Sequence, residues 1–101
     1  MNGKFLDFIS SQDKPVLADF WAEWCGPCRT MGPVLSDLAK DWKGKATVVK
    51  INTEEQSDLA GRFGISGIPT FILFQGGKEV HRVSGAMPLA ALKEQFKRWV
   101  V

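Results

Sequence analysis

Two cysteines separated by two residues, Cys25 and Cys28, are the side chains of this chain best suited to covalent chemistry. They stand in the run Trp24-Cys25-Gly26-Pro27-Cys28. At this spacing two sulfurs close a small ring with little backbone movement, so a dithiol and a disulfide can interconvert. Pro27 stiffens the turn between them, and Gly26 leaves it open to an incoming disulfide. The spacing favours thiol–disulfide exchange, with a pair of inert core cysteines as the alternative.

The position of the pair in the chain strengthens this interpretation. The near-continuous apolar run Val16–Trp21 predicts a strand covered on both faces, and residues 25–42 carry a helical pattern. The pair therefore opens a helix, where unpaired backbone N–H groups and the helix dipole stabilise a thiolate. Cys25 lies nearest the helix N-terminus and is the expected nucleophile. Cys28 lies one turn further in and is expected to be more buried.

Zinc binding is the other chemistry that cysteines support, and the chain is poorly equipped for it. A structural zinc site needs four ligands, whereas the sequence offers two cysteines and His81, far along the chain. An iron–sulfur cluster shared between two chains ranks no higher than zinc. We therefore expect no metal site.

Length and composition restrict the class of protein. The chain has 101 residues, 45% hydrophobic and 24% charged, which is ordinary for a folded protein and predicts one domain over residues 1–101. Two cysteines are too few for a disulfide scaffold, and a net charge of +2 is too small to indicate nucleic acid as a partner. Asp7 interrupts the N-terminal apolar run, and no stretch approaches ~18 apolar residues. We expect a cytoplasmic protein without membrane association.

Apolar periodicity predicts helices and strands in the order α β α β α β β α. The predicted helices cover residues 4–11, 25–42, 55–63 and 88–100, and Pro33 should kink or restart the second of them. The predicted strands cover residues 16–21, 46–52, 70–74 and 79–83. Helices between strands imply parallel crossovers, and Gly76-Gly77 predicts an antiparallel hairpin. The expected fold class is α/β with a mixed sheet.

Two segments, residues 18–28 (ADFWAEWCGPC) and 64–70 (GISGIPT), resemble the thioredoxin family. The resemblance extends from about Phe5 to the last helix. It implies the thioredoxin fold, in which helices flank a central mixed sheet, and a protein-disulfide reductase that works by dithiol–disulfide exchange. Gly-Pro between the cysteines favours a reductant, since oxidant and isomerase relatives usually differ at these two positions.

The resemblance also exposes a difference at the N-terminus. Family members usually begin with a further strand, and only three residues precede the first helix predicted here. We therefore expect a four-stranded sheet rather than a five-stranded one. The strand at 46–52 would then form an exposed edge.

The resemblance assigns roles to residues around the cysteines. Cys28 becomes the resolving cysteine. Asp19 lies in a run expected to be buried, where desolvation raises a carboxyl pKa, and by resemblance it accepts or donates the Cys28 proton. Lys50 interrupts a β-rich run, and by resemblance it lies near Asp19 and modulates it. Solvent-exposed positions are the alternatives for both residues.

A further set of residues is implied to contact the substrate chain. By resemblance the Ile68–Pro69 bond is cis, Pro69 faces the cysteines, and the backbone of Ile68 pairs with the substrate by β-augmentation. The expected binding residues are Trp24, Gly26, Pro27, Gly67, Ile68, Pro69, Gly85 and Ala86. The acidic residues Glu23, Glu54, Glu55 and Asp58 are expected to be solvated surface groups.

The resemblance also implies the partners of the protein. Protein disulfides are the expected substrates, a flavoprotein thioredoxin reductase drawing on NADPH is the expected electron donor, and no cofactor is bound beyond the Cys25–Cys28 disulfide. We expect a monomer. Two other functions remain as alternatives: an oxidase or isomerase outside the cytoplasm, and a binding module whose cysteines are incidental.

Overall fold

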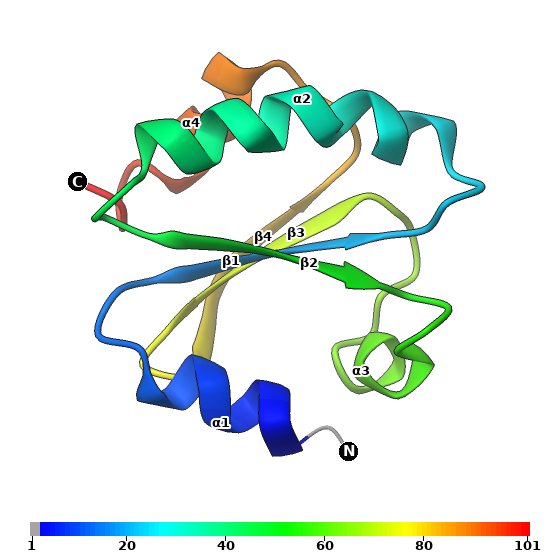
Figure 1. Ribbon diagram of the computed structural model, residues 1–101, viewed down its shortest axis with the longest axis horizontal. Coiled ribbons are helices and arrows are strands. Elements are labelled where there is room, and N and C mark those ends of the chain that lie inside the picture. The colour runs from blue at the N-terminus through cyan, green and yellow to red at the C-terminus, as the bar shows by residue number, and fades with distance from the viewer. Residues whose placement is uncertain (1–2) are drawn as a thin grey trace.

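The computed structural model describes residues 3–101, in which helices cover both faces of one sheet (Figure 1). Its elements follow the predicted order. The helices are α1 (Gly3–Ser11), α2 (Gly26–Asp41), α3 (Ser57–Arg62) and α4 (Leu89–Phe96). The strands are β1 (Val16–Trp21), β2 (Thr47–Asn52), β3 (Thr70–Gln75) and β4 (Lys78–Ser84). None of the helices in this part of the chain is long and apolar enough to cross a membrane.

Within residues 3–101 the sheet has four strands in the order β2-β1-β3-β4. Strands β1 and β2 run parallel, while β3 is antiparallel to both β1 and β4. This is the mixed four-stranded sheet expected from the sequence, with β2 at one edge and β4 at the other. The carboxyl ends of β1 and β2 lie side by side because these two strands are parallel.

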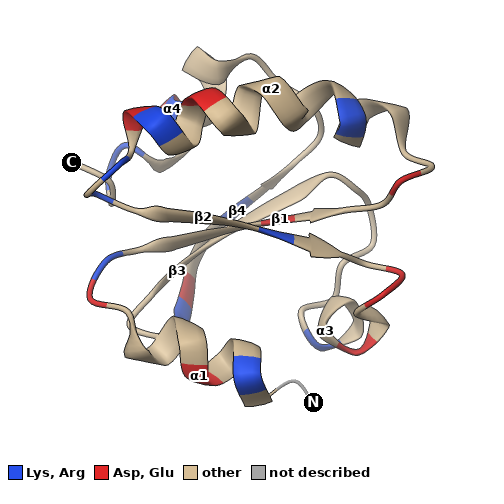
Figure 2. Ribbon diagram, viewed as in Figure 1, with Lys and Arg blue, Asp and Glu red and all other residues tan. Residues whose placement is uncertain are grey.

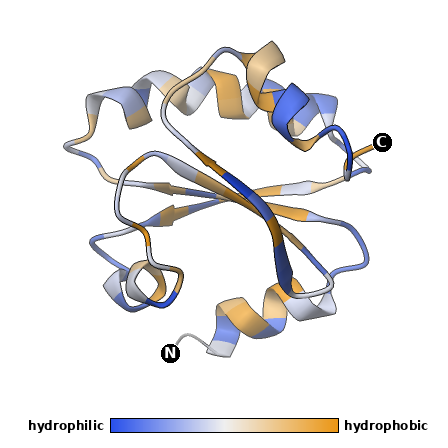
Figure 3. Cartoon of the chain, turned by 180° about the vertical axis from the view of Figure 1, so that it is seen from behind, coloured by the Kyte–Doolittle hydropathy of each residue, from blue (hydrophilic) through white to orange (hydrophobic). Residues whose placement is uncertain are grey.

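The central strands β1 and β3 are buried on both faces, as their apolar runs predict. On one face α2 and α4 cover a core that includes Leu17, Leu38 and Phe96. On the other face α1 and α3 cover a second core that includes Phe20 and Leu59. The edge strand β4 is hydrophilic along much of its length (Figure 3). The two cores hold β1 rigidly, and β1 leads directly into the cysteine motif.

Helices α2 and α4 bear on two of the predictions. Helix α2 continues through Pro33 as one 16-residue element, so the proline does not restart it, and a kink at this position stays a prediction. Helix α4 ends at Phe96 instead of continuing to residue 100. There the Trp99 N–H donates to the Phe96 carbonyl at 3.0 Å in a tight turn, which stacks the Trp99 ring on His81 with centroids 5.3 Å apart. Packing on β4 therefore overrides the helical periodicity.

Candidate active site

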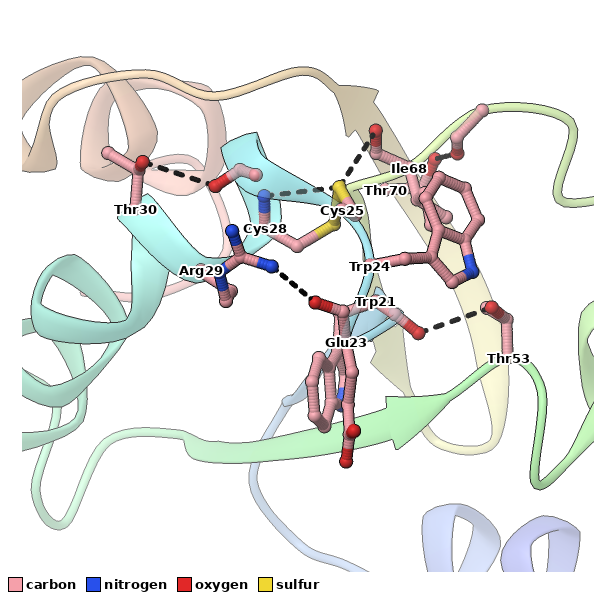
Figure 4. Close-up of a disulfide and its surroundings, with 12 residues drawn as sticks. Trp21, Glu23, Trp24, Cys25, Cys28, Arg29, Thr30, Thr53, Ile68 and Thr70 are labelled. Atoms are coloured by element: carbon pink, nitrogen blue, oxygen red, sulfur yellow. Dashed lines mark hydrogen bonds between the residues drawn. A yellow bond between two sulfur atoms is a disulfide. The ribbon is translucent and has the colours of Figure 1, made fainter.

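Cys25 and Cys28 form a disulfide at the amino end of α2, with their Cα atoms 5.2 Å apart (Figure 4). Cys25 is the N-cap of the helix: its backbone is extended, and its Sγ accepts the backbone N–H of Cys28 at 3.2 Å. Because the first helical turn carries free N–H groups and the positive end of the dipole, this position stabilises negative charge on sulfur. The two residues are 5% and 4% exposed, so the expected difference in burial is small.

A short turn between β1 and α2 places the disulfide. The Cys25 N–H donates to the Ala22 carbonyl at 3.2 Å, and Ala22 packs with the two cysteines and Trp21 in a small buried cluster. The Arg29 guanidinium, from the first turns of α2, donates to a carbonyl of the same turn. The strand, the turn and the helix therefore form one rigid support for the sulfur atoms.

The loop between α3 and β3 lies against the disulfide. Its Ile68–Pro69 bond is cis, as the resemblance implies, and the Ile68 carbonyl oxygen lies 3.9 Å from the Sγ of Cys25 (Figure 4). The Gly85 N–H donates to the Pro69 carbonyl at 2.8 Å, so the segment after β4 and the loop before β3 together form a rim beside the disulfide. The cis-proline loop thus contacts the Cys25 sulfur on one side and the segment after β4 on the other.

Two hydroxyl groups hold this loop in place. Thr70 is 2% exposed, and its Oγ1 lies 2.5 Å from the Gly67 carbonyl oxygen and 2.9 Å from the Oγ of Ser84. This pair fixes the start of β3 to the end of β4 directly behind Pro69. Sequence reasoning missed Thr70 and Ser84, because their pairing depends on the β3–β4 register.

Trp24 forms an exposed wall of the site. Its side chain is 65% exposed, and its indole N–H donates to a carboxylate oxygen of Glu54 at 2.6 Å. Beside it lies a hollow of about 180 Å³, lined by Trp24, Thr53, Ala60, Ile65, Ser66, Gly67 and Ile68. Glu54 was expected to be only a surface charge. The signal that could have found it is topological: Trp24 follows β1 and Glu54 follows β2, whose carboxyl ends are adjacent.

Three further predicted binding residues have open surroundings. Pro27 and Ala86 are exposed, and Gly26 has no other group within 4 Å of where a Cβ would stand. The backbone N–H of Met87, next to Ala86, lies 3.4 Å from the Met31 sulfur of α2. The structure therefore leaves room above the cysteines for an incoming chain.

Asp19 is buried in β1 at 2% exposure, as predicted, and its Oδ1 has no hydrogen-bond partner. It lies on the same face of the sheet as Leu17, the face that α2 covers, because side chains two apart share a face. Burial raises the pKa of Asp19 from 3.8 to about 6, and the positive charge of Lys50 partly opposes that rise. A carboxyl with this pKa exchanges protons near neutral pH.

Lys50 is exposed on β2 and pairs in register with Asp19. Its Nζ lies 4.6 Å from the centroid of the Trp21 ring, which is a cation–π contact. The prediction that Lys50 lies near the buried acid is therefore compatible with the alternative that it stands at a solvent-exposed edge.

No cluster of three or more His, Cys, Asp or Glu side chains suited to a metal ion occurs within residues 3–101. The sulfur atoms are joined to each other in this state, and disulfide chemistry is what their surroundings support. A redox-active disulfide at a helix N-terminus, faced by a cis-proline loop and an open rim, defines a thiol–disulfide exchange protein.

Comparison with known proteins places the chain within that class. The family model described as Thioredoxin matches residues 1–98. Thioredoxin 1 of Nostoc sp. is 44% identical over 93% of this chain and 88% of its own length. A thioredoxin of Chlorobaculum thiosulfatiphilum is 50% identical over 83% of this chain and 78% of its own length. Thioredoxin M4, chloroplastic, of Arabidopsis thaliana is 44% identical over 92% of this chain and 48% of its own length.

The chain therefore belongs to the thioredoxin family, and it is a thiol–disulfide oxidoreductase. The fold and the activity expected from the resemblance are both confirmed. Substrates that carry protein disulfides, and a reductase that restores the dithiol, follow from this membership in general terms.

Proposed function

We propose that Cys25 is the nucleophile and Cys28 the resolving cysteine in the reduction of protein disulfides. The observation that carries this proposal is the position of Cys25 as the N-cap of α2, where its Sγ accepts a backbone N–H. In the dithiol form that N–H and the helix dipole lower the free energy of the thiolate and so raise its population.

The exchange then balances in two steps. The Cys25 thiolate attacks one sulfur of the substrate disulfide, forming a mixed disulfide and releasing the other substrate sulfur as a thiolate that takes up a proton. The Cys28 thiolate attacks the Sγ of Cys25, which releases the second substrate sulfur and leaves the Cys25–Cys28 disulfide. Two electrons pass from the dithiol to the substrate.

Asp19 is proposed as the group that takes the proton of Cys28 in the second step and returns one during recycling. Its pKa of about 6 lets the carboxylate accept a proton near neutral pH, and its place on the α2-covered face directs it to the cysteine side of the sheet. Lys50 is proposed to tune this acid, since its charge holds the pKa of Asp19 below the value that burial alone would set.

The rim around the disulfide is proposed as the binding surface for the substrate chain. Ile68 pairs its backbone with the substrate, Pro69 removes an N–H that would otherwise compete near the sulfur, and Trp24 packs beside the target disulfide. The full proposed set is Trp24, Gly26, Pro27, Gly67, Ile68, Pro69, Gly85 and Ala86. The exposure of Trp24 and the empty space above Gly26 support it.

The wider setting is also proposed rather than observed. We place the chain as a single domain over residues 1–101, monomeric and cytoplasmic, with a flavoprotein reductase drawing on NADPH as electron donor and with no nucleic-acid or membrane partner. The modest net charge of +2 supports the last point. The name of the Arabidopsis relative gives a chloroplast location for that protein. Cell fractionation of the native protein therefore tests the cytoplasmic location proposed here.

The roles of the two cysteines are tested by insulin reduction with dithiothreitol as the terminal reductant. We expect Cys25→Ser to fall to the background rate of dithiothreitol alone. We expect Cys28→Ser to accumulate a covalent adduct with insulin, visible by mass spectrometry and cleaved by excess reductant. A Cys25→Ser variant that reduces insulin as fast as wild type contradicts the proposal. A Cys25→Ser variant that accumulates an insulin adduct through Cys28 also contradicts it.

A further inference from the structure

Strand β2 is an edge of the sheet, and within residues 3–101 it pairs with β1 alone. Figure 1 shows β2, in green, between α2 on one side and α1 on the other. An edge strand presents backbone N–H and C=O groups that can pair with another chain. The composition of this edge decides what such a chain must look like.

The backbone hydrogen bonds show which residues of β2 face outward. The Thr47 N–H donates to the Pro15 carbonyl at 2.9 Å, and the Thr53 N–H donates to the Trp21 carbonyl at 2.8 Å. In a parallel pair, residues whose amides face the neighbour alternate with residues whose amides face away. The odd-numbered positions of β2 therefore face β1, and the even-numbered positions face the open edge.

Three residues present the open edge. Val48 and Lys50 each direct an N–H and a C=O outward, and Asn52 directs its N–H outward. The Asn52 carbonyl already accepts the Gln56 N–H at 2.9 Å, which marks the end of the available ladder. The edge thus offers a short, alternating series of donors and acceptors suited to one extended segment.

A hollow flanks this edge on each face of the sheet. Toward α1, a hollow of about 430 Å³ has Phe5, Phe8 and Ile51 among its lining residues. Toward α2, a hollow of about 200 Å³ has Leu35 and Val48 among its lining residues. A strand added to the edge would direct successive side chains into the two hollows in turn, because side chains alternate across a strand. The hollow toward α1 therefore favours apolar side chains, whereas the smaller hollow toward α2, which Ser36 also lines, accepts small side chains such as threonine.

The charge around the edge is positive. Lys4 and Lys50 line the hollow toward α1, Lys50 also lines the hollow toward α2, and neither hollow has a carboxylate among its lining residues. Lys50 is the only charged residue of β2 (Figure 2). A second copy of this chain fits this edge poorly. Antiparallel pairing centred on Lys50 would set the two Lys50 side chains directly opposite each other, and pairing centred on Val49 would set them diagonally opposite. In both registers the two positive charges repel.

We propose that the β2 edge binds an extended segment of a partner protein whose alternate side chains are apolar and whose ends carry carboxylates. The ladder of Val48, Lys50 and Asn52 supplies the backbone pairing, the hollow toward α1 takes the apolar side chains, and Lys4 and Lys50 pair with the carboxylates. The hollow beside Trp24 shares no residue with either of these, so a docked partner leaves the disulfide accessible.

The test uses the oxidised 101-residue chain and a capped nonapeptide of alternating valine and threonine with glutamate at both ends. In ¹⁵N-resolved NMR titrations we expect saturable shifts at the amides of Val48, Lys50 and Asn52, with slower hydrogen exchange at these amides, and no shift at Cys25. A matched peptide with lysine in place of glutamate should bind more weakly. A peptide methylated at alternate backbone nitrogens, on the pairing side, should not bind.

Two charge reversals provide matched variants. Lys4→Glu should weaken binding by about fivefold, roughly an exposed ion pair's contribution, while insulin reduction stays at the wild-type rate. Lys78→Glu, an exposed change beyond both hollows on the opposite edge strand, should leave binding unchanged.

Several outcomes overturn the proposal. The absence of saturable binding, equal binding of the methylated peptide, or shifts centred on Trp24 and Ile68 would each exclude an edge-docking site. If sedimentation velocity shows a dimer that excludes the peptide, and the dimer is lost on Lys50→Glu or Val48→Pro, the edge is covered by a second copy and the proposed occupant is wrong.

Discussion

At the residue scale, burial of the Asp19 carboxyl destabilises the folded protein when that carboxyl is ionised. It is buried at 2% exposure with Oδ1 unpartnered, and burial raises its pKa to about 6. A carboxyl with a raised folded-state pKa binds more protons in the native state than in the unfolded state between the two pKa values. Stability therefore falls as the pH rises from about 4 through 6, and the full penalty applies above that. The shift from 3.8 corresponds to roughly 3 kcal/mol.

We predict that Asp19→Asn stabilises the oxidised protein at pH 8 by roughly 1–3 kcal/mol and leaves its stability at pH 3.5 nearly unchanged. The asparagine side chain cannot ionise, so the variant should also lose the fall in stability between pH 4 and 6.5. Urea unfolding at a series of pH values measures both effects.

The same variant also tests whether Asp19 takes part in the exchange reaction, apart from its effect on stability. If Asp19 exchanges the Cys28 proton, Asp19→Asn should slow breakdown of the mixed disulfide while the first attack by Cys25 keeps its rate. A variant that is more stable and equally fast in both steps would show that Asp19 has no part in the chemistry.

A second residue-scale prediction concerns Glu54, which positions the exposed Trp24 ring through a 2.6 Å hydrogen bond. Glu54→Ala should raise the KM for insulin several-fold with kcat nearly unchanged, because the indole loses its fixed orientation at the rim. Glu54→Gln, which keeps an acceptor oxygen, should recover most of the affinity. Equal KM values for all three proteins would remove Glu54 from the site.

At the element scale, the strongly patterned segments could be predicted and the contacts between segments could not. The apolar runs of β1 and β3 identify strands buried on both faces, and the Cys25–Cys28 spacing identifies the start of α2. The end of α4 could not be predicted, because Trp99 stacks on His81 of β4 in place of a further helical turn. Local periodicity carries no information about such long-range packing.

The candidate site shows the same division. Short sequence motifs that can be recognised without a structure contain Cys25, Cys28 and Pro69. Glu54 contacts Trp24 only because β1 pairs with β2, and Thr70 contacts Ser84 only because β3 pairs with β4. Neither contact can be predicted before the register of the strands is known. The difference is physical: a motif is local in the chain, whereas a hydrogen bond across strands is a property of the sheet.

The β3–β4 hairpin gives a test at this scale. Its turn residues Gly76 and Gly77 have φ angles of 61° and 82°, as the predicted Gly-Gly hairpin requires. A Cβ at Gly77 would also lie 2.6 Å from the Ser10 Oγ and 3.2 Å from the Ser10 Cα of α1. Gly77→Ala should therefore destabilise the protein by about 2–3 kcal/mol, since it adds a steric clash to the cost of left-handed backbone.

The matched control is Gly76→Ala, which shares the positive φ but has nothing within 4 Å of its Cβ position. It should cost about 1 kcal/mol in urea unfolding. Equal losses for the two variants would mean that α1 yields freely and does not pack tightly on the hairpin.

At the scale of the whole molecule, one sheet separates two hydrophobic cores, and the catalytic motif depends on both. The α2-side core includes Leu38 at 0% exposure, and the α1-side core includes Ile51 at 3%. Strand β1 contributes side chains to each core and ends at the turn that carries Cys25. A loss of packing on either face is therefore transmitted to the same strand.

The two cores should unfold together, as one cooperative unit, because β1 and β3 belong to both. Leu38→Ala should cost about 2–5 kcal/mol and Ile51→Val about 0.5–1.5 kcal/mol. Since the two side chains lie on opposite faces and in separate clusters, the double variant should lose the sum within about 0.5 kcal/mol. Urea unfolding followed by far-UV circular dichroism and by tryptophan fluorescence should give one coincident transition for every variant. Two separated transitions would show that one face unfolds alone and that the disulfide motif can lose half of its support while the other half stays folded.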